Sequence, residues 1–192
     1  MLLKLIKIYA KLRTMFIRNR EKRKLLRGKI IQNLNTKYVY GKQVISTAKS
    51  YDKDLVVMGY SKVNKNTVLG KHVCFNGMNI MGQGNVKIGR YFHSGIECLI
   101  ITQNHNYNKG AAIPYDTTYN YKDVIIDDFV WLGSRVMILP GTHIGEGAII
   151  QGGSVVHGEI PAYSIAGGNP AKVFKYRDIE HFKKLKAEGK FH

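Results

Sequence analysis

Apolar residues recur at every sixth position through the second half of the chain. A period of six matches neither the 3.6-residue period of an α-helix nor the two-residue alternation of a single strand. A short repeat with one apolar residue per unit is typical of a chain that coils into a prism of short parallel strands, each turn burying the one below. The repeated positions are Ile126, Leu132, Ile138, Ile144, Ile150, Val156 and Ala162.

The same ladder begins upstream, near Val63, and is interrupted twice. We expect one inserted residue near Gly84–Val86, where glycines make a bulge inexpensive. After Ile100 the repeat stops, and residues 105–122 are rich in Asn, Tyr and Gly, which predicts a loop extruded from the coil. Loops of this kind usually gather on one functional face. The upstream positions are Val63, Leu69, Phe75, Met81, Ile88, Ser94 and Ile100.

The segments outside the ladder differ from it in charge and pattern. Residues 1–31 contain eleven Lys/Arg and one acid, a net charge of about +10 out of +17 for the chain. Within residues 2–27 the apolar side chains recur at intervals of three and four residues, which predicts a basic amphipathic helix. Such a helix is equally suited to packing on a neighbouring subunit and to lying on an anionic membrane. We expect an irregular lead-in over residues 32–62 and a short helix in the tail, residues 178–192.

Composition narrows the class of protein. Two cysteines, Cys74 and Cys98, indicate neither a disulfide framework nor a metal cluster. No stretch is apolar for long enough to cross a bilayer, and lysines interrupt residues 1–17 where a secretory signal would need an unbroken apolar run. We therefore expect a cytoplasmic protein that the basic helix can hold at the inner face of the plasma membrane. The positive charge calls for an anionic partner, and nucleic acid is the least favoured because the chain has no base-reading module.

Two segments carry the motifs of a known family. Residues 130–177 combine W-L-G, I-L-P-G, I-G-E-G-A, I-P-A-Y-S and G-G-N-P-A-K, and residues 88–110 read IGRYFHSGIECLIITQNHNYNKG. Both resemble the hexapeptide-repeat acyltransferases, in the branch that acetylates maltose, galactosides, virginiamycin and capsular polysaccharides. The resemblance covers residues 63–177 and implies an all-β fold, a left-handed parallel β-helix. It also implies a homotrimer, with active sites between subunits and acetyl-CoA as the donor.

The resemblance points to His105 as the catalytic residue. A sugar hydroxyl is a poor nucleophile at neutral pH, and an imidazole can remove its proton during attack on the thioester and return one to the leaving thiolate. A backbone carbonyl is the expected partner of the second ring nitrogen, with Glu97 as a weaker candidate. Ser134 matches the position that stabilises the thioester oxygen in relatives, although a turn serine would look the same in sequence.

The expected cofactor contacts follow the same correspondence. Trp131 matches the aromatic residue that closes the cleft, where it serves both cofactor and substrate. The pantetheine arm of CoA is expected along Gly152 and Gly153, where absent side chains let it approach. The sequence departs from the family pattern at His157-Gly158, where many relatives carry a basic residue. The CoA phosphates are expected to meet the basic residues after the G-G-N-P motif, namely Lys172, Lys175 and Arg177.

The acceptor side is less specific in the sequence. The leading interpretation is an O-acetyltransferase that acts on a hydroxyl of a sugar or surface polysaccharide by direct attack. Alternatives are transfer to a streptogramin-type antibiotic or to an amino sugar and, in another class, a non-catalytic anion-binding scaffold. No metal site is expected, because His93 and His105 have no third histidine beside them. The expected acceptor contacts are Asn76, Asn79 and the loop tyrosines Tyr107, Tyr115 and Tyr119.

Overall fold

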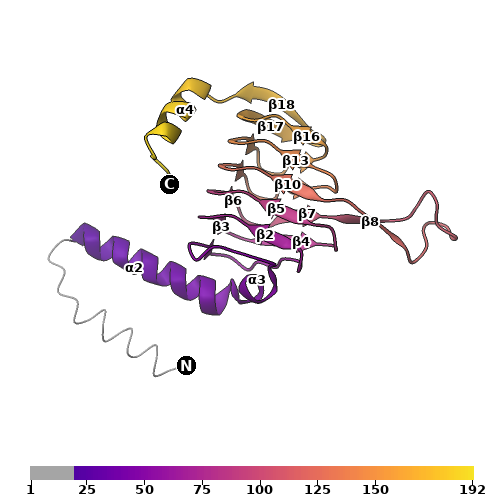
Figure 1. The fold of residues 1–192 in the computed structure, drawn as a ribbon, viewed down its shortest axis with the longest axis horizontal. Helices are drawn as coiled ribbons and strands as arrows, with labels where there is room; N and C mark the ends of the chain where they lie inside the picture. The colour runs from indigo at the N-terminus through magenta and orange to yellow at the C-terminus, as the bar shows by residue number, and fades with distance from the viewer. Residues whose placement is uncertain (1–19) are drawn as a thin grey trace.

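Short parallel strands, stacked turn upon turn, form the body of the molecule (Figure 1). The computed structural model describes residues 20–192. Successive strands of one turn belong to three different sheets, which make the three faces of the coil. This is the architecture that a six-residue repeat predicts, and the expected fold, a left-handed parallel β-helix with short helices at its ends, is confirmed.

The three faces differ in size. The seven-stranded face contains, in spatial order, β1 (Val56–Val57), β3 (Cys74–Phe75), β6 (His93–Ser94), β11 (Trp131–Leu132), β14 (Ile149–Ile150), β17 (Ser164–Gly168) and β18 (Ala171–Tyr176). The five-stranded face contains β16 (Glu159–Ile160), β13 (His143–Ile144), β10 (Val124–Ile126), β5 (Val86–Ile88) and β2 (Thr67–Leu69). The four-stranded face contains β15 (Val155–Val156), β12 (Met137–Ile138), β7 (Cys98–Ile101) and β4 (Met78–Met81).

The ladder residues form the core. Residues three repeats apart lie side by side on one face, as Ile126 does with Ile144. Burying one apolar side chain per strand on each turn therefore makes a continuous apolar column inside the coil. The ladder positions that are at most 1% exposed include Ile126, Leu132, Ile138, Ile144, Ile150 and Val156.

Two predicted positions of the ladder are wrong. Met81 is 51% exposed, and Ile80 instead occupies the core beside Ile100. Ala162 is similarly replaced by Ile160, which lies beside Ile144. In both places the preceding turn is shorter than the repeat, and it contains a glycine with positive φ, Gly77 (142°) or Gly158 (77°). The glycines permit tighter turns that the spacing alone does not reveal.

The lead-in is more helical than expected. Helix α2 (Arg20–Leu34) continues beyond the predicted end at residue 27, and the rest of the predicted helix, residues 2–19, lies outside the described residues. A π-helical turn (Asn35–Val39) and α3 (Lys42–Thr47) follow before β1. The hydroxyl of Thr36, which is buried, accepts a hydrogen bond from the Val57 N–H at 2.8 Å and joins this region to the first strand.

The tail folds back over the seven-stranded face as helix α4 (Ile179–Ala187) (Figure 1). Asp178 caps the helix by accepting a hydrogen bond from the His181 N–H at 2.9 Å. β8 (Gln103–His105) and β9 (Tyr119–Tyr121) form a separate antiparallel hairpin that projects away from the coil (Figure 1).

Candidate active site

His105 is the last residue of β8, on the projecting hairpin. The antiparallel register places it opposite Tyr119, whose ring centroid lies 4.4 Å from that of the imidazole. The ring of Tyr115, from the connecting loop, stacks on the imidazole at 3.8 Å with an interplanar angle of 16°. The expected acceptor contact Tyr115 therefore already has one ring face against the expected catalytic residue.

The hydrogen bonding of His105 differs from the prediction. Its Nδ1 atom is buried and has no hydrogen-bond partner among residues 20–192. The expected backbone carbonyl does not fill that role, and Glu97 instead pairs with Arg135 at 2.7 Å. Within the described part of the chain, ring contacts rather than a hydrogen bond hold the imidazole.

Three of the expected cofactor residues meet at the edge where the seven-stranded face turns into the four-stranded face. Ser134 follows β11, and Gly152 and Gly153 follow β14 one turn further on. The Gly153 N–H donates to the Ser134 carbonyl at 2.8 Å. A Cβ added at Gly152 would lie 3.0 Å from that carbonyl, whereas one at Gly153 would have nothing within 4 Å. This edge, which we call the glycine corner, exposes backbone that an extended ligand can approach.

The side chain of Ser134 is exposed and oriented by the backbone. Its Oγ accepts a hydrogen bond from the Ile96 N–H at 3.3 Å. An oxygen that accepts in this way still has its own proton to donate. Ser134 can therefore donate to a ligand oxygen at the glycine corner.

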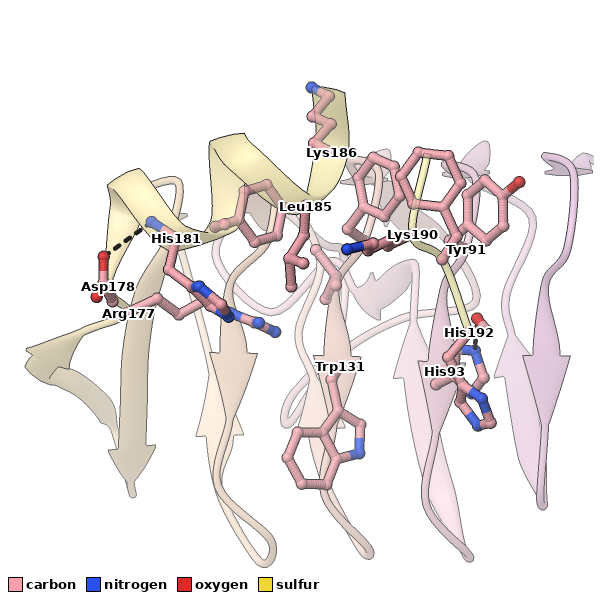
Figure 2. Close-up of a pocket in the computed structure, with 14 residues that line it drawn as sticks. Tyr91, His93, Trp131, Arg177, Asp178, His181, Leu185, Lys186, Lys190 and His192 are labelled. Atoms are coloured by element: carbon pink, nitrogen blue, oxygen red, sulfur yellow. Dashed lines mark hydrogen bonds between the residues drawn. The ribbon is translucent and has the colours of Figure 1, made fainter. Parts of the chain in front are cut away.

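Trp131 and Arg177 line a pocket of about 600 Å³ between the seven-stranded face and α4 (Figure 2). Figure 2 shows Arg177 beneath the helix and the Trp131 ring extending away from it along the sheet. Burial lowers the pKa of Arg177, and its Nε atom has no partner within the described residues. Lys172 and Lys175 lie on β18 with exposed side chains and do not line the pocket.

An aromatic contact holds α4 over this pocket. Phe182 of the helix lies with its ring 5.8 Å from Phe129 and 5.1 Å from Tyr163, both on the coil. Gly147 makes room for it, since a Cβ there would lie 3.0 Å from the Phe182 ring. The sequence did not predict this contact, because it joins segments with no common motif.

The expected acceptor residues are spread over the molecule. The side-chain amide of Asn76 donates to the Ser94 carbonyl at 2.8 Å, so it is used inside the coil. Asn79 is exposed on β4, and Tyr107 is 66% exposed on the hairpin loop. Of the expected set, Tyr115 and Tyr119 contact the His105 ring, and the Tyr107 N–H donates to the His105 carbonyl at 2.9 Å.

The expected site therefore lies in two parts on a single chain. The hairpin leaves the coil after β7, at the edge between the four- and five-stranded faces. The glycine corner lies at the opposite edge of the four-stranded face, and the pocket with Trp131 and Arg177 contains neither His105 nor Ser134. Across residues 20–192 no group of His, Cys, Asp and Glu side chains gathers as metal ligands would.

Comparisons with known proteins agree with this architecture. The sequence profile described as bacterial transferase hexapeptide (six repeats) matches residues 123–158. A chloramphenicol acetyltransferase of Klebsiella aerogenes is 34% identical over 88 residues, which are 39% of this chain and 42% of that protein. WbbJ of Escherichia coli K12, assigned as an O-acetyl transferase of lipopolysaccharide biosynthesis, is 38% identical over 98 residues, 47% of this chain and 50% of that protein. The matches thus span half or less of these curated relatives.

A solved structure extends the likeness to the whole coil. The hexapeptide-repeat acetyltransferase of Vibrio cholerae O1 biovar eltor, in complex with acetyl coenzyme A, superposes with a TM-score of 0.58 at 18% identity. The match covers 84% of this chain and 92% of that one, and at this identity it shows a common fold. The resemblance indicated by the sequence is confirmed, and the chain carries the repeat of the bacterial hexapeptide transferases on the fold of an acetyltransferase of that kind.

Proposed function

We propose that this protein transfers an acetyl group from acetyl-CoA to a hydroxyl of a sugar or surface polysaccharide. The observation that carries the proposal is that His105, on which the ring of Tyr115 stacks, and the glycine corner lie at the two edges of the four-stranded face of the coil. The likeness of the fold to an acetyl-CoA-bound acetyltransferase supports the choice of donor.

The proposed reaction is a direct transfer. His105 removes the proton of the acceptor hydroxyl while the oxygen attacks the thioester carbonyl and forms the new C–O bond. Negative charge develops on the carbonyl oxygen, and the Ser134 hydroxyl donates a hydrogen bond to it. When the C–S bond breaks, the imidazolium returns its proton to the CoA thiolate, which restores the neutral histidine.

The donor is proposed to lie along the glycine corner. The pantetheine arm bonds the exposed backbone at Gly152 and Gly153, with Trp131 as the wall of the cleft. The phosphates are assigned to the basic end of the chain, which comprises Lys172, Lys175 and Arg177. On the acceptor side, Tyr107 has free surface for a sugar, Asn79 lies on the outward side of the four-stranded face, and the amide of Asn76 is already bonded.

We also propose a homotrimer, since a site divided between two edges of one face is completed when copies associate through that face. The outward side of the four-stranded face supports this arrangement because it is largely apolar, whereas a face that stays in water needs polar side chains. Its outward residues include Met81, Leu99, Ile101, Met137 and Val155.

Replacement of the proposed base tests the function. Purified protein is assayed for acetyl-CoA-dependent transfer to a panel of glycans and free sugars, and His105→Ala is expected to lower kcat by about 10²–10⁴-fold. His143→Ala, on the five-stranded face and outside the pocket, is the matched control and should retain activity. Undiminished transfer by His105→Ala would overturn the proposal.

A second acceptor class has a specific observation in its favour. The match to a chloramphenicol acetyltransferase favours an antibiotic hydroxyl as acceptor, which the same general-base chemistry would acetylate. Chloramphenicol and streptogramins therefore belong in the same panel. If kcat/KM for either antibiotic exceeds that for every glycan, the proposed acceptor becomes the antibiotic instead of the sugar.

We further propose a location at the inner face of the plasma membrane. None of the described helices has the length and apolarity that crossing a bilayer requires. Between residues 23 and 42 the chain has no acid, exposes the apolar side chains of Leu25, Ile31, Tyr38 and Val39, and interleaves them with lysine and arginine. Basic surfaces with apolar side chains bind anionic lipid.

Vesicle flotation tests the proposed location. The full chain should float with phosphatidylserine vesicles and not with phosphatidylcholine vesicles, and equal behaviour with both would contradict the proposal.

A further inference from the structure

We propose that Tyr115 is a positioning residue that fixes the plane of the His105 imidazole, and that Asp116 holds Tyr115 in place. The inference rests on the proposed function of His105 as the base. It changes the role expected for Tyr115, from a surface that stacks on the acceptor to a support for the catalytic ring.

The contacts of His105 leave stacking as its means of orientation. A histidine that acts as a base is usually oriented by a hydrogen bond to its second ring nitrogen. Here Nδ1 is buried without a partner in the described residues, while Tyr115 lies nearly parallel to the ring at 3.8 Å. Both imidazole nitrogens point outward in the plane of the ring, so a ring stacked on its face restrains the plane and leaves the edge for an acceptor hydroxyl.

Asp116 explains how a loop residue is kept over the imidazole. Its Oδ2 accepts a hydrogen bond from the Ala111 N–H at 2.8 Å, and its Oδ1 accepts from the Thr118 N–H at 2.9 Å and from Thr118 Oγ1 at 2.5 Å. One carboxylate thus ties together the two sides of the loop that contains Tyr115. These bonds lower the pKa of Asp116, the Thr118 hydroxyl contributing most and the Ala111 N–H next.

The other side-chain hydrogen bonds of the loop are those of Asn106, with Thr118 Oγ1 at 3.1 Å and with the Lys109 N–H at 3.2 Å, and none of them involves Tyr115. Ile113 is 99% exposed, and Tyr115 itself is 46% exposed. No apolar core surrounds the tip of the hairpin, so the position of Tyr115 depends on the Asp116 bonds and on its own contact with His105. Loss of either one should free the imidazole without unfolding the coil.

Steady-state kinetics of Tyr115→Leu, Tyr115→Phe and Asp116→Ala test the assignment. Displacement of a catalytic group by about 1 Å costs roughly 10²-fold, so Tyr115→Leu should lower kcat by about 10–100-fold with both KM values unchanged. Tyr115→Phe retains the ring and should restore kcat, whereas Asp116→Ala should follow Tyr115→Leu. Tyr60→Leu, an exposed tyrosine on the lead-in to the coil, is the control for the substitution itself.

NMR of the His105 ring gives a readout that does not depend on activity. A tyrosine stacked at 3.8 Å shifts the imidazole proton resonances upfield, and Tyr115→Leu should remove that shift. If His105→Ala is inactive but Tyr115→Leu leaves the His105 shift unchanged, or raises the acceptor KM at constant kcat, the positioning role is wrong. Full activity of His105→Ala would instead overturn the proposed function, and the positioning role with it.

Discussion

At the scale of single residues, a charged pair joins two turns of the coil. The carboxylate of Asp128 accepts hydrogen bonds from the Arg90 N–H at 2.6 Å and from Arg90 Nε at 2.8 Å. Burial would raise the pKa of Asp128, but the hydrogen bonds and positive charge of Arg90 outweigh burial and hold this pKa below its ordinary value. The pair therefore stabilises the folded chain only while the carboxylate is ionised.

Arg90→Gln should make this contribution measurable as a function of pH. At pH 7 we expect a loss of roughly 0.5–1 kcal/mol of unfolding free energy, because the arginine is largely exposed. The pKa of Asp128 is lower in the folded chain than its ordinary value of 3.8. The pair therefore stabilises the folded chain fully above pH 3.8, and this contribution is lost as the pH falls through the folded-state pKa. The difference between wild type and Arg90→Gln should thus be constant near neutrality and shrink in acid, measured by urea unfolding.

Arg135→Gln is the matched control, because Arg135 and Glu97 form a pair that is 72% and 62% exposed. This substitution should cost less than Arg90→Gln at pH 7. An Arg90→Gln effect that stays constant down to pH 2 would show that the pair does not act through the charge of Asp128.

Sequence and structure agree on individual residues only as far as a motif extends. The roles of His105, Ser134, Gly152 and Gly153 were predicted from the motifs that resemble the hexapeptide-repeat acyltransferases, and they stay predictions. The stack of Tyr115 on His105 was not predicted, since it depends on the turn that Asp116 closes rather than on any period. The phenylalanine that anchors α4 was missed for the same reason, because it meets Gly147 only in three dimensions.

At the scale of elements, the strands are fixed by which side of the coil each residue faces. In β10, Ile126 is 1% exposed inside the coil, while its neighbour Ile125 is 40% exposed on the outside. The repeat predicts strand positions well because every inward position must be buried against the turns on both sides. It fails where a glycine shortens a turn, as before Ile80 and Ile160, and it does not reach the helices of the lead-in.

The adjacent isoleucines of β10 make a matched pair for testing the ladder. Ile126→Ala should lower the unfolding free energy by about 2–5 kcal/mol, because it opens a cavity between two turns. Ile125→Ala removes the same atoms from a half-exposed site and should cost a small fraction of that. The comparison is made by urea unfolding at one fixed protein concentration, and equal losses would contradict the assigned direction of the ladder.

At the scale of the whole molecule, one chain holds two parts of a proposed site and keeps them on separate edges. The hairpin with His105 and the glycine corner lie on either side of the apolar four-stranded face. Association through that face would bring the hairpin of one copy beside the corner of the next. Helix α2 lies at one end of the coil (Figure 1), and the contact with an anionic surface is proposed for this end.

The central claim, a site completed between copies, is tested most directly by complementation. Chains with His105→Ala and chains with Trp131→Ala, carrying different affinity tags, are coexpressed and purified through both tags. Each variant alone should be weakly active, whereas trimers that carry both tags should recover about a third of the wild-type activity, because one of their three interfaces joins an intact His105 to an intact Trp131. Mixed assemblies no more active than the mean of the two separate variants would contradict the account.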